Sequence, residues 1–267
     1  MKIIEFFGLP FSGKTYYCEY LKKKISKNHE IFNVKNLVIF YLRENNKENL
    51  YSLCLYMKYK FFKDTDKSRS DEQKISLKKE NKSIFFTFTK KILFKSFLEF
   101  HRKKNILFKE SKKKYQTFFN LTSKIIEKEK NRQRKKILKR WFKDELISVY
   151  IANFKKKEGI LLMSEGFIQR FHSYYLYEDE LDLDLLKNYL NLRPKSDFIF
   201  FVDTSKDVIK DRLENFIKFE KNKFYFNNLN KLDIKFSKIM NLIKHTNDFY
   251  VVKNEKNLSQ VFRILDK

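Results

Sequence analysis

The chain has 267 residues, a formal net charge of +26 and a hydrophobic fraction of 42%, which is enough apolar material for one large domain or for a domain with a sizeable insertion. No apolar run reaches the roughly 18 residues that a membrane helix needs, and the first residues lack the features of a secretory signal. We therefore expect a cytosolic protein without a transmembrane segment. The two cysteines and four histidines show no zinc-site or disulfide spacing.

The positive charge comes mainly from lysine, with 49 Lys against 10 Arg. Recognition of bases and phosphates usually uses the bidentate fork of arginine. We therefore expect most of the excess charge to lie on a solvated surface. Attraction of an anionic partner, including nucleic acid, is the less favoured interpretation.

In chain order, the N-terminal part begins with the apolar run "KIIEFF", which predicts a strand over 2–7 and is followed by a predicted helix over 14–27 and a second strand over 30–34. A long stretch without Gly or Pro then has apolar residues at helical spacing among lysines. It predicts helices over 36–62, 84–108, 112–131 and 133–155, with a polar connection over 63–82.

Strand-like runs return in the C-terminal part, again alternating with helical segments. Strands are expected over 160–164, 197–203 and 248–252. Helices are expected over 177–192, 204–219, 228–246 and 257–266. The strand over 248–252 and the helix over 257–266 would complete the fold. Thr204 or Ser205 is the expected N-cap of the second helix, with Asp207 in its first turn.

Five short buried strands that alternate with helices predict a three-layer α/β fold. Residues 1–35 and 158–267 would form its core, and 36–157 would form a basic helical insertion or substrate-side subdomain. The run "KEKNRQRKKILKRWFK" is the most basic part of this insertion. We expect Ile137, Leu138, Trp141 and Phe142 to pack on its apolar side; a surface for a polyanionic acceptor is the alternative.

The loop "GLPFSGKT" at 8–15 fits the pattern G-x-x-x-x-G-K-[ST] and lies between a strand and a helix. In such a loop, backbone N–H groups and the positive end of the helix bind phosphate oxygens. Lys14 would neutralise the β and γ phosphates, and the hydroxyl of Thr15 would ligate Mg²⁺. Phe11 stands where many such loops have a third glycine. The residues expected at the nucleotide are Gly8, Pro10, Phe11, Ser12, Gly13, Lys14, Thr15 and Tyr16.

This loop, "SEGFIQR" after the third strand, and "RPKSDFIFFVDTSKDVIKDRL" resemble the nucleoside and nucleotide kinase branch of P-loop proteins, in particular thymidylate kinase-like and deoxynucleoside kinase-like enzymes. The resemblance covers residues 1–35 and about 158–267. It implies the P-loop NTPase fold, a mostly parallel five-stranded sheet in the order 2-3-1-4-5, and the use of ATP and Mg²⁺.

The resemblance also implies roles for individual residues. Glu165 would be the general base or a metal-linked carboxylate. Arg170 would contact the acceptor or the transferred phosphoryl group, and Arg212 would lie near the ATP phosphates or the adenine. Gln169 and His172 are weaker candidates nearby, and Asp203 is a weaker candidate for a metal or nucleotide contact.

The chain departs from the family pattern in two places. The usual acid–arginine pair is replaced by Glu165-Gly166, and the segment after Arg212 offers lysines where a second arginine is expected. We expect a small-molecule kinase that transfers the γ-phosphoryl group to a hydroxyl or phosphate acceptor. A nucleotide-dependent switch with a basic partner surface and a polynucleotide-end kinase are the alternatives. The sequence does not specify the acceptor or the oligomeric state.

Overall fold

The structure is a computed structural model that describes residues 1–26, 28–44, 84–178, 180–215, 220–245 and 249–253. It divides into two compact units, one of Met1–Leu37 with Ser111–Lys267 and one of Val38–Glu110. The connection expected over 63–82 and the helix expected over 257–266 lie outside the described residues.

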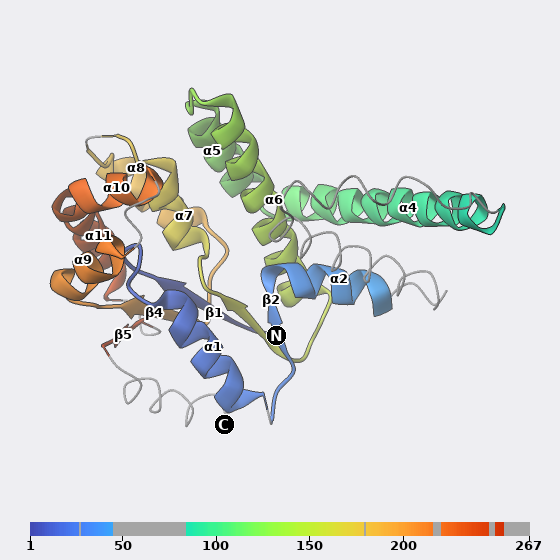
Figure 1. Cartoon of the computed structure of the whole chain (residues 1–267), viewed down its shortest axis with the longest axis horizontal. Helices are drawn as coiled ribbons and strands as arrows, with labels where there is room; N and C mark the ends of the chain where they lie inside the picture. The colour runs from blue at the N-terminus through green and yellow to red at the C-terminus, as the bar shows by residue number, and fades with distance from the viewer. Residues whose placement is uncertain (27, 45–83, 179, 216–219, 246–248, 254–267) are drawn as a thin grey trace. The chain divides into compact units, whose positions relative to one another are not determined.

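Five short strands form the sheet at the centre of the first unit (Figure 1). All its neighbouring strands run parallel, in the order β2-β3-β1-β4-β5, which confirms the order implied by the family resemblance. The strands are β1 (Lys2–Phe7), β2 (Ile31–Asn33), β3 (Ile160–Met163), β4 (Phe198–Val202) and β5 (Phe249–Val252).

Helices pack on both faces of this sheet, and the alternation of side chains along β1 shows how. Ile4 and Phe6 join a buried cluster with Cys18 and Leu21 of helix α1 (Lys14–Ile25). Glu5 points to the opposite face, where its carboxylate accepts a hydrogen bond from the backbone of helix α7 (Phe167–Tyr174). The sheet therefore lies between α1 and α7.

The other helices agree with the periodicity, with shifted ends and two helices that the sequence did not predict, α7 and α10. The helix expected over 36–62 begins earlier, at Val34, and its residues beyond 44 lie outside the described part. The described helices are α2 (Val34–Glu44), α4 (Ile84–Lys114), α5 (Gln116–Glu127), α6 (Arg132–Phe154), α8 (Leu183–Leu192), α9 (Lys206–Glu214), α10 (Glu220–Asn227) and α11 (Leu229–Ile243).

The division into units differs from the one expected from sequence, because residues 111–157 belong to the unit that contains the sheet. Helix α6 contributes a continuous buried run from Glu145 to Ala152 and contacts β1, β3 and α7. Of its expected apolar residues, Leu138 and Phe142 are buried, whereas Ile137 is exposed. The helices that follow α4 are thus part of the sheet-containing unit.

Candidate functional site

The loop between β1 and α1 is shaped by three residues with positive φ: Gly8 (150°), Phe11 (64°) and Gly13 (96°). A Cβ on Gly8 would lie 2.8 Å from the carbonyl oxygen of Val202, so this position excludes any side chain. A Cβ on Gly13 would meet nothing closer than 3.5 Å, and only the left-handed backbone favours glycine there. Glycine is therefore required at position 8 because no space is left for a side chain, and it is favoured at position 13 by the backbone conformation alone.

Lys14 is the first residue of α1, and its side chain folds back over the loop. Its ammonium donates to the carbonyl oxygens of Gly8 at 3.1 Å and Leu9 at 2.8 Å. Burial, which leaves Lys14 only 6% exposed, lowers its pKa to about 8, and the charge of Glu165 acts in the opposite direction.

The first turn of α1 presents its backbone N–H groups without a side-chain cap. The N-cap residue is Gly13, and the first helical hydrogen bond is donated by the N–H of Tyr17. Thr15 and Tyr16 are exposed at this end. Ser12 is 1% exposed and its hydroxyl has no hydrogen-bond partner among the described residues. An uncapped helix start beside a buried lysine and an unpaired hydroxyl suits the binding of an anion.

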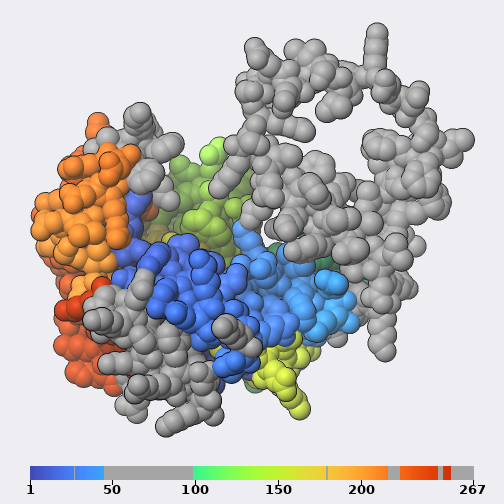
Figure 2. Space-filling model, turned by 60° about the horizontal axis from the view of Figure 1, so that its bottom comes forward, coloured from blue at the N-terminus to red at the C-terminus, as the bar shows by residue number. Residues whose placement is uncertain are grey.

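Three side chains from distant segments hold the loop in place. The N–H of Gly8 donates to Oε1 of Gln169 at 3.0 Å. The hydroxyl of Thr204 donates to the carbonyl oxygen of Ser12 at 2.7 Å, and Nη1 of Arg212 donates to that of Phe11 at 2.7 Å. Figure 2 shows the N-terminal segment, in blue, directly beside the segment in orange that contains α9.

These contacts refine several sequence predictions. Arg212 contacts the loop between β1 and α1, where its partner is the carbonyl oxygen of Phe11; whether it lies near a nucleotide stays a prediction. Ser205 is the N-cap residue of α9, although its side chain makes no capping hydrogen bond; Asp207 is in the first turn as expected. Gln169, a weaker candidate from sequence, binds the loop directly.

Phe11 is the one non-glycine residue with positive φ in the described part of the chain. The left-handed conformation costs a residue with a Cβ about 1 kcal/mol, and glycine avoids this cost. We therefore expect Phe11→Gly to be more stable than Phe11→Ala by about 1 kcal/mol, because both lose the ring and only Gly relieves the backbone. Urea unfolding of the two variants measures the difference, and an alanine variant as stable as the glycine variant would contradict it.

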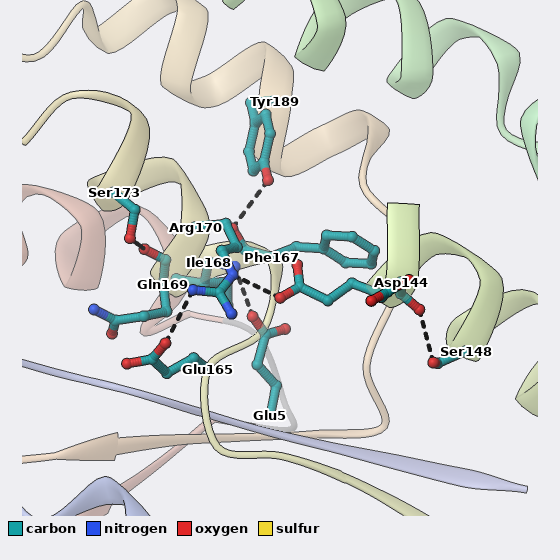
Figure 3. A network of polar contacts seen from close by, with 11 residues as sticks. Glu5, Asp144, Ser148, Glu165, Phe167, Ile168, Gln169, Arg170, Ser173 and Tyr189 are labelled. Atoms are coloured by element: carbon teal, nitrogen blue, oxygen red, sulfur yellow. Dashed lines mark hydrogen bonds and ion pairs between the residues drawn. The ribbon is translucent and has the colours of Figure 1, made fainter. Parts of the chain in front are cut away.

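Glu165 and Arg170 meet at the end of β3 (Figure 3). Oε2 of Glu165 lies 2.9 Å from Nη1 of Arg170, and the Glu165 side chain is 47% exposed. Nε of Arg170 also donates to the buried Glu145 at 2.6 Å, and its guanidinium lies 4.3 Å from the ring centre of Trp141. The structure therefore brings Glu165 and Arg170 together, and it adds two residues of α6: Glu145, which the sequence did not single out, and Trp141, which was expected only to pack on the apolar side of its helix.

Glu5 is a further polar residue that the sequence analysis missed, and it is completely buried. Its Oε1 accepts from the N–H of Ile168 at 2.6 Å. Its Oε2 accepts from the hydroxyl of Ser196 at 2.9 Å and pairs with Arg193 at 3.4 Å. A Cβ on Gly166 would lie 2.5 Å from Oε1 of Glu5, so the glycine that follows Glu165 makes room for this carboxylate.

The remaining weaker candidates have other surroundings. His172 is buried against the ring of Phe236, and burial together with Lys235, Lys14 and Arg134 lowers its pKa to about 3. It therefore stays neutral near pH 7. Asp203 pairs with Lys253 at 3.5 Å, at the ends of β4 and β5.

A scan against protein-family models and a search of the curated proteins found no match for this chain. In the described segments, no helix combines the length and the apolar character needed to cross a membrane. The same segments contain no group of three or more His, Cys, Asp or Glu residues arranged to hold a metal ion.

Proposed function

We propose that the chain is an ATP- and Mg²⁺-dependent phosphotransferase with the P-loop NTPase fold, which transfers the γ-phosphoryl group to a small acceptor. The observation that carries the proposal is the position of Lys14. It lies in a loop that matches the phosphate-binding pattern, at the uncapped start of α1, within electrostatic reach of Glu165. Parallel α/β sheets commonly bind their ligands at such a strand end.

The loop would bind the phosphates through its backbone. The N–H groups in the first turn of α1 have no helical acceptors, and the unpaired hydroxyl of Ser12 can donate a further hydrogen bond. Lys14 would turn from the carbonyls of Gly8 and Leu9 to the phosphate oxygens. The exposed ring of Tyr16 and the side chains of Pro10 and Phe11 lie along the same segment and can contact the nucleotide from outside the loop.

Thr15 and Glu165 fit a magnesium ion. Mg²⁺ typically keeps several waters and takes one or two protein oxygens in addition to phosphate oxygens. The hydroxyl of Thr15 is exposed at the start of α1, and the carboxylate of Glu165 is half-exposed. The ion would supply charge neutralisation at the phosphates.

Glu165 and Arg170 would act on the acceptor side. As the alternative to holding the ion, the half-exposed carboxylate of Glu165 can accept a proton from an acceptor hydroxyl, and Arg170 beside it can stabilise negative charge that develops on the transferred group. This arrangement depends on the contacts of Arg170 with Glu145 and Trp141 of α6. Without them, the guanidinium would be held only by the exposed Glu165 and would move with it.

Nucleotide binding should weaken above pH 8. The pKa of Lys14 is lowered to about 8 in the free protein, and a bound polyanion raises it again, so binding above pH 8 must take up a proton. We expect affinity for ATP and Mg²⁺ to fall about tenfold between pH 7 and pH 9. Calorimetry in buffers of different ionisation enthalpy measures both the affinity and the proton uptake. Lys14→Arg should bind with little change over this range; an equal pH dependence in this variant would contradict the assignment.

The proposal is tested by incubating the protein with ATP, Mg²⁺ and a panel of hydroxyl and phosphate acceptors, and by following transfer of the labelled γ-phosphoryl group. Transfer to one acceptor class, lost in Glu165→Gln, is the expected result. Tight ATP binding without transfer to any acceptor, together with a macromolecule bound differently in the ATP and ADP states, would instead identify a nucleotide-dependent switch.

A further inference from the structure

Glu145 is the most deeply buried carboxylate of α6, with a side chain that is 3% exposed. Helix α6 packs against α7, the helix that bears Arg170. A buried carboxylate is costly unless it is paired, and its Oε1 pairs with Nε of Arg170 at 2.6 Å. Because Glu145 contacts Arg170 of the candidate site, its role can extend beyond stability.

Arg170 is held by three groups at once. Glu145 binds Nε, Glu165 binds Nη1, and the ring of Trp141 lies against the guanidinium, 4.3 Å from its central carbon. The ring and the two carboxylates contact the guanidinium at different points, which restricts its movement. The side chain of Arg170 is 10% exposed, so it has little freedom outside this arrangement.

The two carboxylates differ in what they can reach. Glu165 is 47% exposed and can turn to a substrate or a metal ion, whereas Glu145 is enclosed. When Glu165 engages a ligand, Glu145 and Trp141 are the contacts of Arg170 that remain. We propose that Glu145 is the positioning residue of this site, which holds Arg170 in its working orientation while Glu165 acts. This inference rests on the proposed function.

The electrostatic surroundings agree with such a role. Burial raises the pKa of Glu145 to about 7, opposed by Arg170 and reinforced by the carboxylates of Glu5 and Glu165. Burial, and after it the charge of Glu145, raises the pKa of the Tyr174 hydroxyl on α7. A folded-state pKa above the usual value means that the ion pair with Arg170 is complete above about pH 8 and weakens as the pH falls through 7.

The chain contains one tryptophan, so the fluorescence of Trp141 reports on this site alone. The test compares wild type with Glu145→Gln and, as the matched control, Glu165→Gln, at pH 8 and without nucleotide. The first readout is Trp141 emission, and the second is hydrogen exchange of the Arg170 Nε–H, measured by NMR with ¹⁵N-arginine and assigned with Arg170→Lys. We expect Glu145→Gln to shift the emission and to speed exchange at least about tenfold, and Glu165→Gln to change exchange less than about twofold.

Kinetics then separate positioning from nucleotide binding. In Glu145→Gln, kcat for phosphoryl transfer should fall about tenfold while KM for ATP stays within about twofold. Exchange at Arg170 that is as slow in Glu145→Gln as in wild type would overturn the inference. If that variant does not fold, the wild-type protein provides the test. After correction for the intrinsic pH dependence of exchange, the exchange rate of the Arg170 Nε–H should rise from pH 8 to pH 5.5. A corrected rate that stays constant overturns the inference. The fluorescence and exchange readouts need no substrate, so they stand even if the phosphotransferase proposal fails.

Discussion

Replacing Lys14 by methionine should reduce phosphoryl transfer about a thousandfold, because the charge at the developing transition state is lost. Charged hydrogen bonds to the bound phosphates are lost as well, so ATP affinity should fall about ten- to a hundredfold. Transfer is measured with labelled ATP at saturating concentration and binding by calorimetry.

The same variant should not lose stability, which separates a functional role of Lys14 from a structural one. Burial lowers the pKa of Lys14 to about 8, so the folded protein bears a desolvation cost for this ammonium. Methionine fills a similar space without this cost. The matched control is Lys23→Met, an exposed residue on the same helix, which should leave activity and stability unchanged. A Lys14→Met protein that is destabilised and still active would contradict the assignment.

Gly166→Ala should lower the free energy of unfolding by about 3 kcal/mol or more, because the new Cβ would lie 2.5 Å from a buried carboxylate oxygen of Glu5. Glu5 cannot move aside without giving up its hydrogen bonds with Ile168 and Ser196 and its ion pair with Arg193. The backbone of Gly166 has a φ of −102°, so the cost arises from the clash and not from the conformation.

Gly13→Ala is the comparison for Gly166→Ala, because its Cβ has room and only its left-handed backbone opposes a side chain. We expect it to cost about 1 kcal/mol. Chemical denaturation of both variants measures the two costs. If Gly166→Ala is no more destabilising than Gly13→Ala, the packing of Glu5 against Gly166 does not have the importance assigned to it here.

The strands and the loop could be predicted because their signals are local. Short apolar runs with glycine or proline close to one or both ends mark β1, β3 and β4, and the spacing of Gly8, Gly13 and Lys14 marks the loop. Parallel strands buried on both faces give such continuous runs. The positions of Glu165 and Arg170 followed from the family resemblance, which placed them at the end of the third strand.

The residues that the sequence did not reveal depend on contacts between distant segments. Glu5 is a single acidic residue inside an otherwise apolar run, and its partner Ile168 is 163 residues away. Glu145 follows a lysine-rich run that looks like a solvated helix surface, and Trp141 was expected only to pack within that run; the packing of α6 against α7 brings both to Arg170. A carboxylate within a strand that is otherwise apolar could have drawn attention to Glu5, although not to Gly166.

Helix ends were also difficult to predict, for a physical reason. Residues 177–192 are acidic and helical in pattern, but α8 begins at Leu183 because Asp182 caps it by accepting from the N–H of Leu185 at 2.9 Å. Helix α7 is eight residues long, too short for periodicity to be recognised, and its side chains are mostly buried.

The central claim is that the loop at 8–15 binds the phosphates of ATP, and calorimetric titration of the protein with ATP in the presence of Mg²⁺ tests it most directly. We predict saturable binding at one site per chain in wild type, with affinity at least about tenfold weaker in Lys14→Met and unchanged in Lys23→Met. Absence of binding to wild type, or equal affinity in wild type and Lys14→Met, would contradict the account.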